Sequence, residues 1–243
     1  MSPSELVEEI REICRENTDP AIVAKYSKYF QDGYDAYGLK LEQIEETVME
    51  ILDAGAGYKL IQQTCRILVR SPKYEETSFA ILLTKAFEKD FSSKTIHELE
   101  FWFTFGITNW AHADVISTEL IFPLFQNNMI GLKELEDWKS ASNKFQRRAV
   151  AVGLIKPMKA NKEISPYLDF LSALMLDKEK EVQQGLGWFL GEAWKVNESI
   201  TEEFLMKWKN KSPGFIFQSA TENMNEEETK RFRIEKYQIS SKK

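Results

Sequence analysis

The feature that most constrains the fold is the regular return of helix-breaking residues along the chain. Proline, glycine and N-capping side chains recur roughly every 12 to 20 residues, and the apolar residues between them follow helical spacing. No segment of the 243 residues shows the alternation of apolar and polar side chains that a half-buried strand requires. The chain is therefore predicted to be all-α.

The breakers and caps divide the chain into a succession of predicted helices. These cover residues 2–17, 20–30, 41–54, 58–69, 74–89, 92–107, 109–125, 131–141, 144–158, 166–176, 180–196, 201–212, 215–223 and 226–237. The predicted N-caps are Ser4, Asp19, Asn109, Asn143 and Thr201, because their side chains accept hydrogen bonds from first-turn backbone N–H groups. The last four residues, 240–243, are expected to be frayed.

Pairs of these helices repeat with a period of roughly 35 to 45 residues, which is in the range of HEAT-like repeats. The breaker spacing favours stacked antiparallel pairs over a coiled coil, since no heptad is apparent. We therefore predict one domain over residues 1–243, a HEAT-like helical-repeat solenoid with a concave face.

Composition and termini indicate a cytoplasmic protein. Cys14 and Cys65 lack the CxxC spacing of a metal or redox site, so two free thiols are expected. Residues 1–5 have neither the basic nor the apolar part of a signal peptide. No apolar run approaches the roughly 18 residues that a membrane span needs.

The net charge of −6 argues against a generally adhesive nucleic-acid binder, but the charge is unevenly distributed. Residues 138–162 contain no Asp or Glu. Their basic residues are Lys139, Lys144, Arg147, Arg148, Lys156, Lys159 and Lys162. This basic window has two interpretations: a confined polyanion-binding face, or an ordinary solvated helix surface.

The motif Asn-Trp-Ala-His-Ala-Asp at residues 109–114 is typical of a helix start. Trp110 and Asp114 are four residues apart and would share one helix face, with Ala111 and Ala113 leaving the pair uncrowded. An indole beside a carboxylate suits recognition and hydrolysis of a cationic group. The alternative is a core tryptophan followed by a solvated aspartate.

Familiar catalytic motifs are missing from the sequence. The two histidines, His97 and His112, are too few and too scattered for a histidine-based metal site, and there is no P-loop, dinucleotide fingerprint or GxSxG elbow. The sequence therefore predicts carboxylate and aromatic chemistry without metal or cofactor, or no catalysis.

A second aromatic motif lies at residues 184–194. Gly187 and Gly191 are one helical turn apart and leave a smooth stripe beside Trp188. Such a stripe permits close approach of another helix, or of a ligand backbone.

Together these motifs resemble the DNA alkylation repair glycosylases with HEAT-like repeats, the AlkD-like family. The resemblance covers nearly the whole chain. It is carried by Ala-Lys-Tyr at 24–26 with Tyr29, Phe30 and Gly38, by the Trp-x-x-x-Asp motif at 110–114, by Gln-Arg-Arg-Ala-Val at 146–150, and by Gly-Leu-Gly-Trp-Phe-Leu at 185–190. The chain differs from the family at Gly191, where an arginine is often found.

The resemblance implies a monomeric hydrolase of base excision repair that removes N3- and N7-alkylated purines from duplex DNA without a cofactor. Trp110 and Trp188 would contact the deoxyribose of the damaged nucleotide, and Asp114 would stabilise its oxocarbenium-like sugar and position water. Arg148 would hold phosphate, and Tyr26 would line the cleft. The DNA backbone would also be held by Lys144, Arg147, Lys156 and Lys159. The protein would associate with the nucleoid when bound to DNA.

Physical chemistry fits these residue types. An alkylated purine is already cationic and leaves with little acid help, so the sugar mainly needs a counter-charge, which a carboxylate supplies. Two alternatives remain at this point. One is a non-catalytic HEAT-like protein that binds branched or distorted DNA, and the other is a protein-interaction scaffold.

Overall fold

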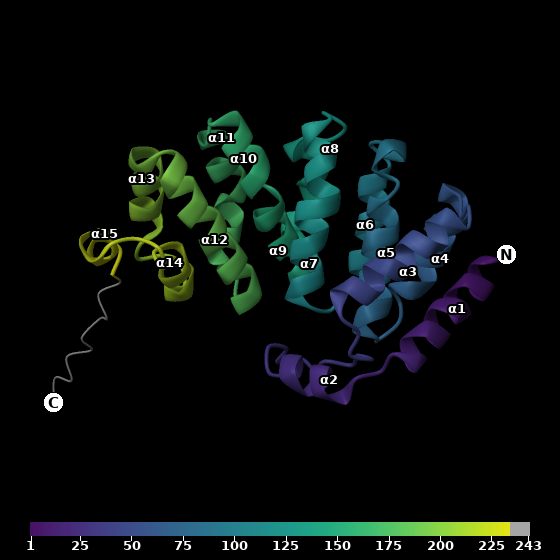
Figure 1. Cartoon of the computed structure of the whole chain (residues 1–243). Coiled ribbons are helices and arrows are strands. Elements are labelled where there is room, and N and C mark those ends of the chain that lie inside the picture. The colour runs from purple at the N-terminus through teal and green to yellow at the C-terminus, as the bar shows by residue number, and fades with distance from the viewer. Residues whose placement is uncertain (234–243) are drawn as a thin grey trace. The chain divides into compact units, whose positions relative to one another are not determined.

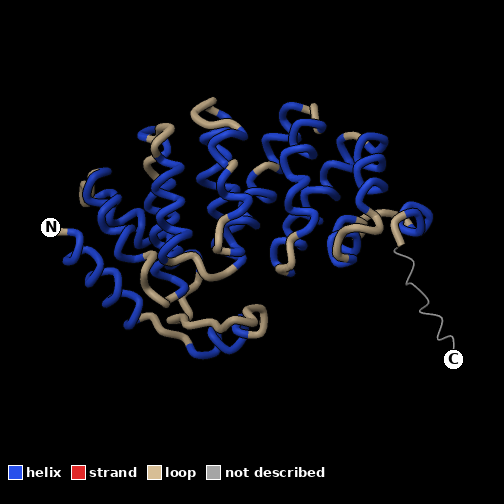
Figure 2. The backbone as a smooth tube through the Cα atoms, turned by 180° about the vertical axis from the view of Figure 1, so that it is seen from behind, coloured by secondary structure: helices blue, strands red, loops and turns tan. Residues whose placement is uncertain are grey.

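The computed structural model describes residues 1–233, and its regular elements are all helical over that range (Figure 2). The all-α prediction is therefore confirmed for the described residues. Contacts between helices group the chain into two compact units, Met1–Glu134 and Leu135–Lys243, which are treated separately below. Helices packed in succession within each unit are compatible with a helical-repeat solenoid. The single domain and the concave face stay predictions.

The helices of the two units are labelled in Figure 1. Those of the N-terminal unit are α1 (Pro3–Glu16), α2 (Pro20–Ser27), α3 (Leu41–Asp53), α4 (Tyr58–Leu68), α5 (Tyr74–Lys85), α6 (Thr95–Phe105), α7 (Trp110–Ile116) and α8 (Phe122–Gln126). Those of the C-terminal unit are α9 (Lys144–Gly153), α10 (Ile155–Asn161), α11 (Ser165–Leu171), α12 (Lys180–Val196), α13 (Glu198–Trp208), α14 (Gly214–Ala220) and α15 (Glu226–Arg231).

Each unit is built around one helix that is buried on most sides. In the N-terminal unit this is α5, which packs against α1, α3, α4 and α7, and in the C-terminal unit it is α12, which packs against α9, α10, α13 and α14. Burial on several faces explains why α5 lacks an amphipathic pattern, since a surrounded helix needs no polar side. By contrast, α2 buries none of its residues.

Three of the predicted caps are confirmed. The side chains of Asp19, Asn109 and Asn143 accept hydrogen bonds from first-turn N–H groups of α2, α7 and α9. Local residue type was sufficient in these cases because an N-cap depends only on its own side chain and the next three backbone amides. Cys14 and Cys65 are buried free thiols, as expected.

Two cap predictions were wrong by a few residues. Ser2, not Ser4, caps α1, because Ser2 and Glu5 satisfy each other's backbone N–H groups in a capping box. Asn197, not Thr201, caps α13, and the Thr201 hydroxyl instead donates back to the Asn197 carbonyl at 2.8 Å. In both helices a capping residue that lies earlier in the sequence begins the helix, so the predicted cap lies inside it.

Two predicted long helices are interrupted, and a proline explains each interruption. The helix of residues 109–125 contains a π-helical turn at Ser117–Ile121, because Pro123 has no N–H for the carbonyl four residues earlier and its ring would collide with it. The helix of residues 144–158 breaks at Leu154 for the same reason, since Pro157 lies within the first turn of α10.

Shorter elements replace the predicted helix ends elsewhere. Residues 131–141 form two 3₁₀ turns, Leu132–Leu135 and Asp137–Ser140, and the helix after Ser165 ends in a third at Ser172–Leu176. Helix α15, the last one within residues 1–233, ends at Arg231. The predicted helix end at Tyr237 and the predicted frayed tail lie outside the described residues.

Candidate active site

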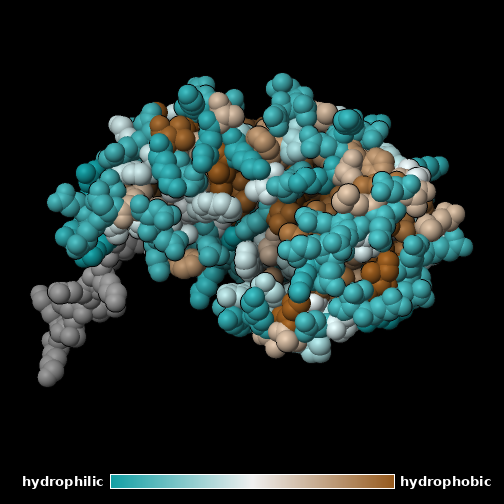
Figure 3. Space-filling view, viewed as in Figure 1, coloured by the Kyte–Doolittle hydropathy of each residue, from teal (hydrophilic) through white to brown (hydrophobic). Residues whose placement is uncertain are grey.

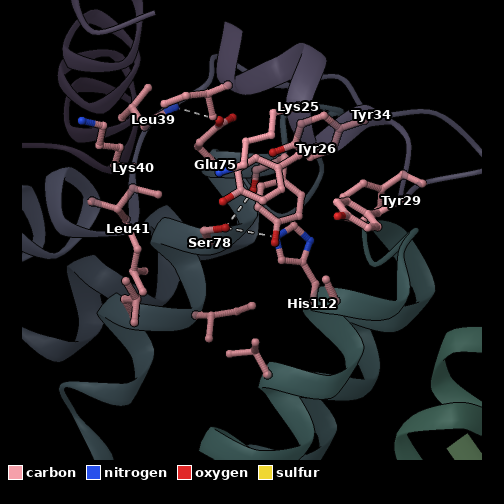
Figure 4. A pocket seen from close by; sticks show the side chains of 18 of the residues that line it. Lys25, Tyr26, Tyr29, Tyr34, Leu39, Lys40, Leu41, Glu75, Ser78 and His112 are labelled. Carbon is pink, nitrogen blue, oxygen red and sulfur yellow. Dashed lines mark hydrogen bonds between the residues drawn. The ribbon is translucent and has the colours of Figure 1, made fainter. Parts of the chain in front are cut away.

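The start of α7 is fixed by a hydrogen-bonded network beneath it. Asn109 Oδ1 accepts the backbone N–H of His112 at 2.9 Å, and its Nδ2 lies 2.8 Å from His112 Nδ1. On the other side of the ring, His112 Nε2 lies 3.1 Å from the Ser78 hydroxyl, which donates to the Tyr74 carbonyl. The network thus ties the cap of α7 to α5 (Figure 4).

The same network assigns the histidine tautomer. Asn109 Nδ2 can only donate, so His112 Nδ1 accepts and the ring proton lies on Nε2, where it faces Ser78. His112 is 3% exposed, and its burial lowers its pKa to about 3. A neutral imidazole is therefore a fixed part of this helix start at ordinary pH.

Trp110 and Asp114 lie one turn apart on α7, as predicted from their spacing. Trp110 is 37% exposed, its ring stacks on Phe30 with centroids 5.8 Å apart, and its Nε1 donates to the Tyr29 carbonyl at 3.3 Å. Asp114 is half-buried. The indole is therefore a partly open surface ring and not a core residue.

Beside Trp110 the N-terminal unit has a cavity of about 860 Å³. Figure 4 shows Tyr26, Tyr29 and Tyr34 along one side of it, Leu39, Lys40 and Leu41 along the other, and Ser78 with His112 between them. Tyr26 lines this cavity, and its place in a DNA-binding cleft stays a prediction. Ala111, His112 and Val115 of α7 contribute to the lining, whereas Asp114 is not among the lining residues.

In the C-terminal unit, the glycine stripe of α12 is occupied by another helix. A Cβ on Gly187 would lie 2.4 Å from the Ser219 Cβ, and one on Gly191 would lie 3.1 Å from the Ala220 carbonyl oxygen. The stripe therefore serves the close packing of α14 and is not open to a ligand backbone. Trp188, on the same helix, is 42% exposed.

Arg148 extends along α12 and is only 4% exposed. Its Nη1 donates to the Glu181 carbonyl at 2.7 Å and to Gln184 Oε1 at 3.4 Å. Gly185 makes room for it, because a Cβ there would lie 2.9 Å from the arginine Cγ. The arginine thus joins α9 to the half of α12 that precedes Trp188.

At least four of the seven basic residues of the window pair with carboxylates that lie outside it in sequence. Lys144 pairs with Glu181 at 2.7 Å, Arg147 with Asp177 at 2.6 Å, Lys159 with Glu192 at 2.7 Å and Lys139 with Glu136 at 2.8 Å. Residues 138–162 contain no Asp or Glu, but carboxylates of residues outside this range lie beside their basic side chains. These ion pairs do not decide between the two interpretations of the basic window, and the DNA contacts of Lys144, Arg147, Arg148, Lys156 and Lys159 stay predictions.

Several side chains of the site were not identified from the sequence. The structural role of His112 was missed because its partners Asn109, Ser78 and Tyr74 come from two helices. The pairing acids Asp177, Glu181 and Glu192 were missed because they lie about one helix pair further along the chain. Helical spacing of Glu181, Gln184 and Trp188 was the available signal for a shared face.

No group of three His, Cys, Asp or Glu side chains among residues 1–233 is arranged to hold a metal ion. None of the helices within that range is long and apolar enough to cross a membrane. The surface drawn in Figure 3 is mostly hydrophilic, with apolar residues in separate patches.

Comparison with curated proteins finds no significant match to the chain. The family described as DNA alkylation repair enzyme matches residues 10–224, which spans α7, the cavity beside it, and the α9–α12 contacts. The match covers most of the sequence, and the chain therefore belongs to the DNA alkylation repair enzyme family.

Proposed function

We propose that the protein is a DNA glycosylase that releases cationic N3- and N7-alkylated purines from duplex DNA. The observation that carries this proposal is the pair formed by an open indole, Trp110, and a carboxylate, Asp114, one turn apart on α7. Membership of a DNA alkylation repair family supports DNA as the substrate.

The start of α7 is suited to holding this pair still. Asn109, His112 and Ser78 form a neutral network with the proton on His112 Nε2, so the network itself adds no charge beside the carboxylate. Catalytic groups gain most when surrounding contacts fix them before the substrate arrives.

The proposed reaction balances without a cofactor. The bond between C1′ and the purine nitrogen breaks, and its electron pair neutralises the positive charge of the alkylated base. The sugar becomes an oxocarbenium-like cation that the Asp114 carboxylate stabilises. A water then bonds to C1′ and gives up a proton, for which Asp114 is the acceptor.

Trp188 contacts the substrate in this proposal, and Arg148 holds Trp188 in position. Trp188 offers an exposed indole face for packing on a deoxyribose. Arg148, buried along α12, acts on Trp188 by fixing the helix that carries it. Exposed Lys156 and the remaining basic residues contact the phosphate backbone without reading sequence.

Base release from methylated duplex DNA tests the proposal. We expect the wild-type protein to release free alkylpurine, and Asp114→Asn to lower the single-turnover rate about 100-fold or more while keeping the side-chain shape. Asp53→Asn, an exposed aspartate at the end of α3, is the matched control and should keep the wild-type rate. Undiminished release by Asp114→Asn would rule out the assigned role.

The alternative is binding of branched or distorted DNA without catalysis. It is favoured by Gly191, whose position against Ala220 excludes the arginine often present in the family, and by the ion pairs that occupy the basic window. Gel-shift titrations with intact, bulged and junction duplexes separate the two. Tight junction binding with no base release supports the alternative.

A further inference from the structure

The cavity of the N-terminal unit has an unusually aromatic lining for a surface feature. Phe30 stacks between Tyr34, at 4.7 Å with an interplanar angle of 10°, and Trp110, at 5.8 Å with an angle of 17°. Tyr74 meets both Phe30 and Tyr34 at the inner end. The volume of about 860 Å³ lies within the range of small-molecule sites.

Two further rings stand open at this cavity without serving a core. Tyr26 is 41% exposed and Tyr29 is 55% exposed, and α2, which carries Tyr26, buries none of its residues. Exposed aromatic side chains that support no packing are costly to keep in water, and they are frequent where a ring stacks on a ligand.

The cations beside these rings are not neutralised. Lys25 Nζ lies 5.1 Å from the Tyr26 ring centroid, and Lys28 Nζ lies 5.1 Å from that of Tyr29. Among residues 1–233, Lys25, Lys28 and Lys40 form no ion pair with a carboxylate. In Figure 4 the Lys25 side chain reaches over the cavity, while Lys40 lies at its edge.

Within the described part of the chain, the two carboxylates that line the cavity, Glu75 and Glu42, form no ion pair with these lysines. Glu75 is buried, and its two carboxylate oxygens accept the N–H groups of Tyr37, Gly38 and Leu39 at 2.8, 2.7 and 3.2 Å. Its charge is therefore spread into backbone dipoles. Glu42, at the start of α3, is the other carboxylate of the lining and is exposed to solvent at the rim.

The walls are held in place before any ligand arrives. The Asp19 N–H donates to the Tyr37 carbonyl at 3.0 Å, so both ends of the segment that carries Tyr26 and Tyr29 are joined. Gly38 has φ +93°, and a Cβ there would lie 2.2 Å from the Asp19 carbonyl oxygen, so this close approach requires glycine. A preformed wall costs less ordering on binding.

We propose that this cavity binds one unpaired nucleotide of single-stranded DNA, with the base stacked on Tyr26 and Tyr29 and the phosphate held by Lys25. Every base has a π face, so the site is tolerant of sequence, and the lysines make it sensitive to salt. The proposal uses DNA as ligand because of the family, but it does not depend on base excision.

Fluorescence anisotropy with a labelled single-stranded oligothymidine tests the stacking part. We expect Tyr26→Ala and Tyr29→Ala each to weaken binding about 5- to 100-fold, with Tyr26→Phe restoring it because the ring remains. Phe105→Ala, an exposed aromatic residue of α6, is the matched control and should bind as wild type does. Equal affinity of the wild-type, Tyr26→Ala and Tyr29→Ala proteins would overturn the site.

Salt titration tests the phosphate part. Lys25→Ala should reduce the slope of log affinity against log salt by about 0.7, whereas Lys89→Ala, an exposed lysine outside the cavity, should leave the slope unchanged. Binding of free thymidine as tight as that of the oligonucleotide, with no effect of Lys25→Ala, would overturn the nucleotide assignment in favour of a planar small molecule.

The outcome is separable from that of the proposed glycosylase. Asp114→Asn should retain single-strand affinity, because Asp114 is not among the residues that line the cavity. A protein that binds oligothymidine as described but releases no alkylpurine would support this inference and contradict the proposed function. Base release without the predicted tyrosine and lysine effects would do the reverse.

Discussion

Two lysine-bearing regions of the molecule differ in what their charges face. In the α9–α12 region the basic side chains meet carboxylates, as with Lys144 and Glu181 or Arg147 and Asp177. Around α2, Lys25 and Lys28 lie over tyrosine rings instead. A larger share of the positive charge is therefore paired with carboxylates in the α9–α12 region than around α2.

The difference also concerns how each region is held together. Ion pairs join α9 and α10 to the acidic residues before and within α12. The α2–α5–α7 region relies on a neutral histidine and on a carboxylate, Glu75, that is satisfied by backbone N–H groups. In the α9–α12 region the cations stabilise the packing of helices, whereas around α2 they are available to a ligand.

Removal of a cation that holds the α9–α12 region together should have the largest effect on stability. Arg147→Ala should lower the free energy of unfolding by about 3 kcal/mol, because it leaves the largely buried Asp177 carboxylate without its partner. Urea denaturation measures this. Lys28→Ala, the control from the other region, should stay within about 0.5 kcal/mol of wild type. If Arg147→Ala weakens only DNA binding, the ion pair is not structural.

The pH dependence of stability tests whether His112 is held neutral in the α2–α5–α7 region. Burial lowers the pKa of His112 to about 3, so below the ordinary pKa of about 6.5 the unfolded chain binds a proton that the folded chain does not. Stability is thus complete above pH 6.5 and decreases as the pH falls toward 3. Between pH 6.5 and 5 the expected loss from this group is about 2 kcal/mol.

Denaturation at several pH values checks this expectation. His112→Gln keeps a polar side chain beside Asn109 and Ser78 but does not titrate, so its profile over this range should be flatter than that of wild type. His97→Gln, which removes an exposed histidine of α6, is the control. Identical profiles for wild type and His112→Gln would mean that the histidine is not held neutral.

The smallest expected effect comes from freeing paired lysines in the α9–α12 region, so that they resemble the unpaired lysines around α2. Glu192 is partly buried, which opposes ionisation, but hydrogen bonds from Lys159 and Lys195 outweigh burial and hold its pKa below the usual value. Glu192→Gln should release both lysines and steepen the salt dependence of duplex binding by up to about 0.9 for each lysine that meets a phosphate. An unchanged slope would show that this surface does not contact DNA.

The sequence predicted those parts of the fold that depend on neighbours along the chain. Asp19, Asn109 and Asn143 were identified as caps, and the bounds of the helix from Lys180 to Val196 were predicted correctly. The interruptions caused by Pro123 and Pro157 were missed, although each proline was visible, because apolar periodicity continued through them.

For the candidate site, the sequence predicted which residues share a helix face, whereas the roles of these residues stay predictions. Trp110 and Asp114 follow from spacing on one helix, and the exposed rings of Trp110 and Trp188 are compatible with their assigned contacts. The pairing of Arg147 with Asp177 and the cavity beside Trp110 depend on segments 30 or more residues apart, which no local pattern reports. Counting charges along a window therefore does not show which of them are paired.

The hydrogen bond between Asp19 and Tyr37 makes the stretch between them a closed module. A grafted loop joined at these two residues would have to keep Phe30, on which Trp110 stacks, and a carbonyl at the place of Tyr29, which accepts from Trp110 Nε1. Ligand preference in the neighbourhood of Trp110 can thus be exchanged through the remaining loop side chains, while the helix that carries the carboxylate is inherited intact.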